Sequence, residues 1–195
     1  MIRQVFWGAA VLAVALLTGC AHPISLSTDA SRLMGSGQAK IDRKVGLVVT
    51  DDQRKQEVVT PGGGGDKVSY LPYRDMEPGL YVVLSESFAG VVRISGPNDP
   101  KIAAEGLHLL VVPVVGTTSF SPSIMTWPPT VFTVELNLGF NDLQNKPVAQ
   151  VRVQGEGRAE FDEFKADHSL SAKRAAEDAL KKLLKAVGET AARLK

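Results

Sequence analysis

Hydrophobic and polar residues alternate most regularly in the second half of the chain. In residues 131–140 every second side chain is apolar, and residues 148–161 follow the same pattern. A period of two is typical of a strand with one buried face. Residues 141–146 between the two segments, most of them polar, suit a hairpin connection. The pattern therefore predicts an antiparallel pair of strands.

A helical period replaces this alternation from about residue 169 or 171 to residue 194. One apolar stripe there is formed by Ala176, Leu180, Leu183, Val187 and Leu194. Opposite charges four residues apart, at Glu177–Lys181 and Asp178–Lys182, support a helix. Because an apolar stripe needs a surface to cover it, this helix is expected to pack on the sheet.

The pattern in the first half is less uniform. Residues 45–50 and 107–115 are short apolar runs typical of strands, and Pro113 indicates that the second run ends or lies at a sheet edge. Residues 80–93 have helical spacing, with Pro78 suited to a first turn. Their paired valines favour a strand instead, so both interpretations stay open. Residues 101–105 suit a further helical turn, and the serine-, threonine- and proline-rich residues 116–130 suit a loop.

Together these segments predict an α+β domain. We expect a small, mostly antiparallel sheet packed against two helices, one of them the long C-terminal amphipathic helix. A chain of 195 residues has room for one such domain, over 45–195, and an additional tail. Residues 20–44 are polar and suit a tether, although Ile24 and Leu26 alternate with polar neighbours and could form a short edge strand. The glycines at 62–65 suit a loop.

The N-terminus has a different pattern. Arg3 is followed by an apolar run at residues 5–17 and then by Thr18, Gly19 and Cys20. A basic start, a short apolar core and small residues are the parts of a signal peptide. The run is shorter than the roughly 20 residues that a membrane-spanning helix needs. Residues 1–19 are therefore predicted to be a signal peptide.

Residues 17–20 resemble a bacterial lipobox. The resemblance implies that the thiol of Cys20, the only cysteine of the chain, carries a diacylglycerol and that cleavage occurs before it. It also implies acylation of the new amino group, palmitate being a typical chain. Two or three acyl chains anchor a protein stably. Ala21 is not the aspartate of an inner-membrane retention signal, so an outer-membrane lipoprotein facing the periplasm is expected. A plain signal peptide with a chance cysteine is the alternative.

Composition narrows the range of partners. The chain has 22 basic and 21 acidic residues, and removal of Arg3 with the signal leaves the two kinds equal. Nucleic acid is not expected as a partner, because phosphate binding needs a clustered positive excess.

The histidines do not suggest a metal site. His22, His108 and His168 lie far apart in sequence and lack the spacing of metal ligands. Because no catalytic motif is visible either, we expect no enzymatic activity, no cofactor and no metal.

One predicted loop contains residue types that are common in protein interfaces. Aromatic and apolar side chains lie there close to a pair of prolines in the sequence: Phe120, Met125, Trp127, Pro128 and Pro129. Prolines reduce the entropy cost of presenting an aromatic side chain, and aromatics dominate interface energetics. These residues are a candidate interaction loop. Alternatively, Trp127 packs back over the sheet edge or over the seam between helix and sheet.

The order of these elements, with the WPPT of residues 127–130 and the AEDALKKLLKA of residues 176–186, resembles small proteobacterial lipoproteins. The group includes uncharacterised members, auxiliary lipoproteins of ABC-type transporters, and relatives of the curli pore and of penicillin-binding-protein activators. Over residues 45–187 the resemblance implies a non-enzymatic adaptor or assembly factor that binds an envelope protein or itself. The alternative is an auxiliary subunit of envelope lipid or glycan transport, which predicts an apolar groove between helix and sheet.

Overall fold

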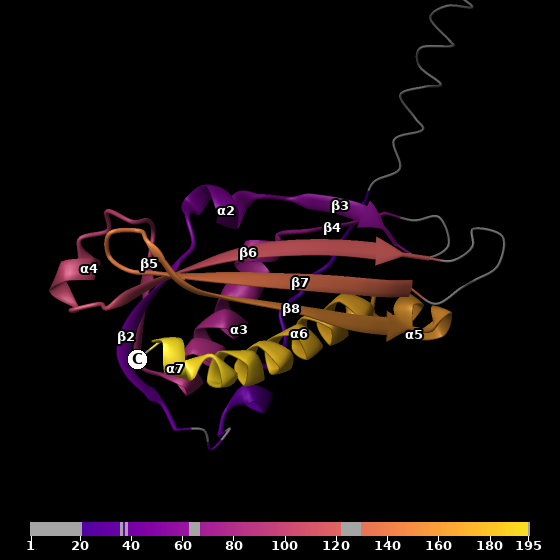
Figure 1. Cartoon of the computed structure of the whole chain (residues 1–195). Coiled ribbons are helices and arrows are strands. Elements are labelled where there is room, and N and C mark those ends of the chain that lie inside the picture. The colour runs from indigo at the N-terminus through magenta and orange to yellow at the C-terminus, as the bar shows by residue number, and fades with distance from the viewer. Residues whose placement is uncertain (1–20, 36, 38, 63–66, 122–129, 195) are drawn as a thin grey trace, which may run out of the picture.

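The computed structural model describes residues 21–35, 37, 39–62, 67–121 and 130–194. These residues form an α+β body, as the sequence predicts, but it has two sheets rather than the single one expected (Figure 1). The strands are β1 (His22–Pro23), β2 (Ile41–Val48), β3 (Val58–Pro61), β4 (Lys67–Tyr70), β5 (Phe88–Ile94), β6 (Leu109–Phe120), β7 (Thr130–Asn141) and β8 (Pro147–Ala159). The helical segments are η1 (Ala30–Leu33), α2 (Asp51–Lys55), α3 (Pro72–Ser87), α4 (Lys101–Ala104), α5 (Phe161–Ala166), α6 (Leu170–Glu189) and α7 (Ala191–Leu194).

The larger sheet has the order β5-β2-β6-β7-β8, and the smaller one has the order β1-β4-β3. The predicted antiparallel pair, β7 and β8, is confirmed. The expectation of a mostly antiparallel sheet is wrong, because β2 runs parallel to both β5 and β6, and β1 runs parallel to β4. Parallel neighbours need a crossover connection, and α3 supplies the one between β2 and β5. Both sheets are therefore mixed.

The expectation of two helices is also wrong, since the described residues contain six α-helices. Only α3 and α6 are long, with 16 and 20 residues. Four others have four to six residues each. Segments this short contain barely more than one helical turn, so they leave no apolar period to detect. The long C-terminal helix itself is confirmed.

Residues 80–93 are helical in their first part and extended in their second part, so the helix and the strand interpretation are each correct for one part. Helix α3 continues to Ser87, and strand β5 begins at Phe88 without an intervening loop. Pro78 lies inside the helix rather than in its first turn. Its side chain faces solvent, so the backbone carbonyl that loses its helical donor can bond water.

Strand β6 extends beyond the predicted boundary. Residues 116–120, expected in a loop, pair with β7 as far as Phe120 opposite Val131. Strand β2 pairs with β6 only up to Val111, so the rest of β6 lies at an edge. The N–H of Val115 at this edge donates to the Tyr73 hydroxyl at 3.4 Å. Pro113, which has no N–H to donate, therefore falls where no neighbouring strand requires one.

Helix α6 packs directly on the backbone of β8. A Cβ added at Gly155 would come within 2.3 Å of the Ala175 carbonyl oxygen, and one at Gly157 within 2.1 Å of the Ser171 carbonyl oxygen. Glycines on the strand opposite alanines and a serine on the helix allow this close approach. The apolar stripe of α6 is buried, as predicted, with Leu183 and Val187 fully enclosed.

The seam between α6 and the sheet is consequently filled by direct contact. The transport alternative predicts an apolar groove between helix and sheet, and where α6 meets Gly155 and Gly157 of β8 the two elements are in direct contact instead. On the opposite side of the sheet a smaller core, comprising Val48, Ile94, Leu107 and Leu110 with Ile102 of α4, covers β2 and the start of β6. Within the described residues, no helix covers the rest of β6, β7 and β8 on that side, and we call this side the outer face.

Candidate functional site

The segment that follows Cys20 is folded against the body. His22 and Pro23 pair with β4, and the N–H of Ile24 donates to the Ser69 carbonyl at 2.8 Å. Ile24 and Leu26 are buried. The predicted tether of residues 20–44 is therefore not free along its length. Its alternative, a short edge strand near Ile24 and Leu26, is the better description of this part.

A buried carboxylate holds this segment in place. Asp75, in the first turn of α3, is only 5% exposed. Its Oδ2 accepts the N–H of Leu26 at 3.0 Å, and its Oδ1 accepts Nε of Arg74 at 3.2 Å. The Ser27 hydroxyl donates to the carbonyl oxygen of Asp75 at 3.4 Å. The N-terminal segment is thus bonded to the first turn of a core helix.

Two of the three histidines meet beside this segment. The rings of His22 and His168 are stacked, with centroids 4.9 Å apart and planes at 11°. Phe164 of α5 meets the His168 ring edge-on, also at 4.9 Å. The separation of these histidines in sequence concealed the contact, and no local signal could have revealed it. His108 lies elsewhere, where its Nδ1 accepts the N–H of Lys44 at 3.1 Å.

The two histidine rings are nearly parallel and form a stacking contact. Across the described residues, no group of three or more histidine, cysteine, aspartate or glutamate side chains could hold a metal ion.

Ion pairs fasten α5 to α6 at the same end of the molecule. Arg174 donates to Glu163 Oε1 at 2.9 Å and to Oε2 at 3.0 Å. This bidentate bond, together with the N–H of Glu160, lowers the pKa of the Glu163 carboxyl to about 2. Lys173 bonds Asp167 at 2.9 Å and is the main cause of a lowered pKa at that carboxyl. The ends of both helices are therefore held by charge-assisted bonds.

Phe120, the first residue of the candidate interaction loop, also lies at this end. It ends β6 and is 62% exposed. The adjoining Ser119 hydroxyl donates to the Pro61 carbonyl at the end of β3. Met125, Trp127, Pro128 and Pro129 lie outside the described residues, and so does Cys20. Within the described part of the chain, no helix is long and apolar enough to cross a membrane.

These contacts bring several segments to one end of the molecule. We call it the anchored end because the N-terminal segment is fastened to the body there, and we define it by His22, Pro61, Phe120, Glu163 and His168. In Figure 1 the tips of β3, β6 and β8 and helix α5 lie together at the right, whereas α4 lies at the left. The hairpin between β7 and β8, residues 142–146, is at the opposite end from Phe120 because both strands run the full length of the sheet.

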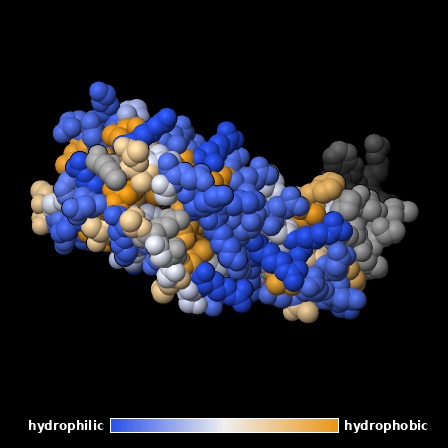
Figure 2. Space-filling view, turned by 60° about the horizontal axis from the view of Figure 1, so that its bottom comes forward, coloured by the Kyte–Doolittle hydropathy of each residue, from blue (hydrophilic) through white to orange (hydrophobic). Residues whose placement is uncertain are grey.

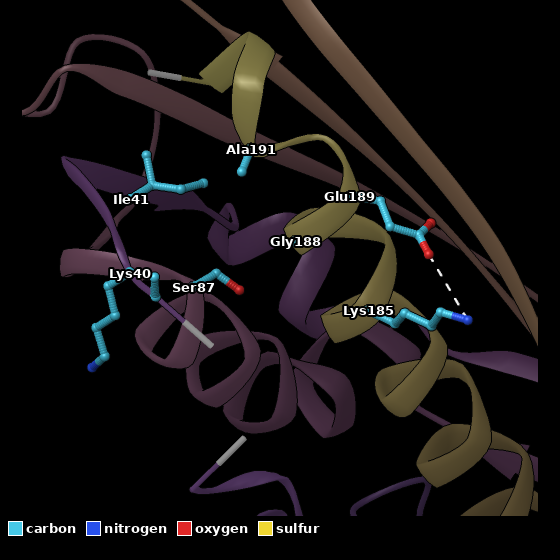
Figure 3. A pocket seen from close by; sticks show the side chains of 8 residues that line it. Lys40, Ile41, Ser87, Lys185, Gly188, Glu189 and Ala191 are labelled. Atoms are coloured by element: carbon cyan, nitrogen blue, oxygen red, sulfur yellow. Dashed lines mark ion pairs between the residues drawn. The ribbon is translucent and has the colours of Figure 1, made fainter. Parts of the chain in front are cut away.

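A pocket of about 490 Å³ lies at the C-terminal ends of α3 and α6 (Figure 3). Its size is in the range of small-molecule sites. Three of the polar side chains that line it are engaged, since the Ser87 hydroxyl donates to the Val83 carbonyl at 2.8 Å and Lys185 pairs with Glu189 at 3.8 Å. No set of polar groups converges on its centre, so it carries no functional assignment.

The outer face is polar and shallow. Arg152 pairs with Glu135 at 2.6 Å, and Gln150 donates to Asn137 at 2.8 Å. Gly116 leaves a hollow of about 430 Å³ among threonine side chains beside Glu135. The face that carries α6 is mainly hydrophilic as well (Figure 2). Its most exposed residues include Arg174, Lys181, Lys182 and Lys185.

No protein-family model matches the chain, and no curated protein does. A DUF330 protein from Xanthomonas campestris is similar in structure, with a TM-score of 0.51 and 12% identity over 90% of this chain and 96% of that one. A minor lipoprotein from Acinetobacter baumannii has a TM-score of 0.48 and 8% identity, over 76% of this chain and 94% of that one. Uncharacterized lipoprotein B from Nitrosomonas europaea has a TM-score of 0.45 and 12% identity, over 78% and 87%.

The similarity to the Xanthomonas protein extends over nearly the whole of both chains. At 12% identity it concerns the fold and not the chemistry of any site. The resemblance to small proteobacterial lipoproteins that the sequence indicates is thus confirmed at the level of the fold. This chain therefore has the fold of the DUF330 protein.

Proposed function

We propose that this protein is a lipoprotein anchored to the outer membrane through Cys20, and that it acts in the periplasm as a non-enzymatic adaptor or assembly factor. The observation that carries the proposal is the position of Cys20 directly before a folded segment. Only residues 21–23 separate it from Ile24, whose N–H is bonded to Ser69. A lipid on Cys20 would therefore fix the folded body itself at the membrane.

The outer-membrane assignment rests on the residue after the cysteine. Ala21 takes the position where an aspartate would indicate retention in the inner membrane. The names of two structural neighbours, a minor lipoprotein and an uncharacterized lipoprotein, agree with a lipid anchor. Fractionation of the envelope on a density gradient tests this assignment, and recovery of the protein with the inner membrane would contradict it.

The anchor is tested by the variant Cys20→Ser. We expect the wild-type protein to incorporate labelled palmitate and the variant to lose the label, because the chain has no other thiol for the diacylglycerol. Lys146→Ala, in the distant hairpin, is the matched control and should stay labelled. Palmitate incorporation by Cys20→Ser would refute the assignment.

The adaptor role is proposed for the outer face of β6, β7 and β8. Sheets that bury one face and leave the other open offer a broad surface for a second protein, and Val114 is an exposed apolar residue on this open face. An envelope protein or a second copy of this chain is the expected partner. The arrangement of paired charges such as Arg152–Glu135 would give such contact a fixed register.

A photo-crosslinking amino acid at Gln154, on the outer face, tests this role in native envelopes. The same group at Lys181, on the exposed side of α6, is the control. We expect a defined crosslinked product from position 154 and none from position 181. Equal products from both positions, or none from position 154, would contradict the assignment of the partner surface.

A further inference from the structure

We infer that the anchored end lies on the lipid headgroups of the membrane and that Phe120 inserts into the bilayer interface. This inference rests on the proposed lipidation of Cys20. Its first support is the short distance available to the chain. An extended chain spans at most about 3.6 Å per residue, so Ile24 can lie no more than about 15 Å from the lipidated residue.

The second support is the rigidity of the attachment. Ile24 is bonded to Ser69 and buried, and the N–H of Ser25 donates to the Ser169 hydroxyl at 3.2 Å. The stacking of His22 on His168 extends the contact to the residue before Pro23. These bonds leave no free tether between Ile24 and the body, so the end of the body that holds this segment must stay close to the membrane.

The third support is the chemistry of that end. Phe120 is an aromatic side chain that is 62% exposed, and aromatic residues favour the zone between headgroups and acyl chains. Ser119 holds the end of β6 against Pro61 of β3, whose partner strand β4 pairs with His22. Phe120 is therefore carried on the same structure as the anchor point.

Charge contributes little to this contact. Lys67 and Lys165 are exposed at the anchored end, but so are Glu160 and Asp162. Because both signs are present, we expect binding to depend on apolar insertion more than on anionic lipid. The surface thus fits a bilayer of mixed headgroups and does not require a strongly acidic one.

The inference changes the interpretation of the candidate interaction loop. Phe120 begins this loop, and its position places the start of the loop at the membrane rather than at a soluble partner. Strand β7, with 12 residues, runs from this end for about 40 Å. The hairpin at residues 142–146 is then the part of the sheet farthest from the anchor.

Fluorescence quenching by lipids tests the inference in the full lipidated chain. Cys20 carries lipid, so Lys165→Cys and Gln144→Cys each introduce a single free thiol, at the anchored end and in the distant hairpin respectively. The labelled proteins are reconstituted in vesicles of phosphatidylethanolamine and phosphatidylglycerol that contain headgroup-labelled quenching lipids. We expect strong quenching at position 165 and none at position 144. Equal quenching at both positions, or more at 144, would overturn the inference.

Phe120→Asp in the Lys165→Cys background tests insertion itself. We expect a partial loss of the quenching, because the lipid on Cys20 still holds the anchored end near the membrane. Val148→Asp, a matched change at an exposed apolar residue near the hairpin, should leave the quenching unchanged. Circular dichroism confirms that both variants are folded. Unaltered quenching in Phe120→Asp would rule out the insertion of this side chain.

Two further outcomes separate the inference from the proposed function. If the protein is not lipidated, palmitate labelling fails before any vesicle is made, and the proposed function fails with it. If it is lipidated but the position-165 fluorophore is shielded only in native envelopes and never in vesicles, the anchored end binds a protein. That result would overturn the present inference and leave the lipid anchor intact.

Discussion

Gly155 shows at the scale of single residues how closely α6 and β8 approach each other. A Cβ at this position would lie 2.3 Å from both the Ala175 carbonyl oxygen and the Ala179 nitrogen. These are backbone atoms on the buried side of the helix, and they cannot move aside as a flexible side chain can. Gly155→Ala should therefore lower the free energy of unfolding by about 1–3 kcal/mol, the usual cost of overpacking. Urea denaturation measures this change.

Gly116→Ala is the control for this substitution. Gly116 is exposed on the outer face, and a Cβ there would meet only Glu135 Cβ, at 3.6 Å. We expect a change within about 0.5 kcal/mol. Equal destabilisation by the two alanines would show that contact with the helix does not explain the effect at Gly155.

Asp75 provides a second residue-scale prediction. Its replacement by alanine removes the acceptor of the Leu26 N–H and leaves that buried donor unpaired. The cost of an unsatisfied buried group is about 1–3 kcal/mol, and it falls on the N-terminal segment. Hydrogen exchange at Leu26 should therefore accelerate in Asp75→Ala. Asp29→Ala, at an exposed carboxylate that bonds only Ser31, is the control and should leave exchange at Leu26 unchanged.

At the scale of elements, α6 also protects the free edge of β8. Asp178 accepts the N–H of Glu156 at 3.0 Å, and Lys182 donates to the Gln154 carbonyl at 2.9 Å. Unpaired edge groups promote pairing with other chains. The double variant Asp178→Ala/Lys182→Ala should therefore self-associate at concentrations where the wild type does not, as measured by light scattering.

Lys185→Ala serves as the control for this edge. Lys185 pairs with Glu189 on the same helix and makes no bond to β8. The Lys185→Ala substitution removes one positive charge from α6 without uncovering the edge of β8. If Lys185→Ala associates as strongly as the double variant, loss of surface charge is the cause, and edge protection by Asp178 and Lys182 is refuted.

The sequence correctly predicts the elements in which buried residues recur at one regular spacing along the whole element. The stripe of α6 and the alternation of β7 and β8 belong to this class, and the pairs of Glu177 with Lys181 and of Asp178 with Lys182 form as expected. The second role of Asp178 and Lys182, on the edge of β8, was not predictable. It depends on which strand lies beside the helix, and the helical period contains no information about that.

At the scale of the whole molecule, the mixed sheet is the feature that the sequence did not predict. Strand direction depends on where a chain returns after a crossover, and residues 80–93 combine the end of a helix with the start of a strand. The anchored end could not be predicted either, because it is formed by residues that are far apart in the sequence. His22 and His168 are in contact although 145 residues lie between them, and the burial of Asp75 is set by the N-terminal segment that folds over it.

The stability of the molecule in acid depends on carboxylates at the anchored end, and Glu163 is the clearest case. Its pKa falls from 4.5 to about 2 in the folded protein because Arg174 bonds both carboxylate oxygens. Between these two values the unfolded chain binds more protons at this group than the native state does, so stability increases with pH there. The contribution of Glu163 is complete above about pH 4.5 and is lost as the pH falls through about 2.

Glu163→Gln should therefore lower the thermal midpoint at pH 6 and weaken its pH dependence between pH 2 and 4.5. The amide keeps the size of the side chain but has no charge to lose, so wild type and variant should converge near pH 2. Asp162→Asn, at an exposed neighbour on the same helix, is the control and should follow the wild-type profile. A constant difference between Glu163→Gln and wild type across the whole range would show that the contact between α5 and α6 is stabilised by packing, and that the Glu163–Arg174 ion pair does not set the acid limit of the fold.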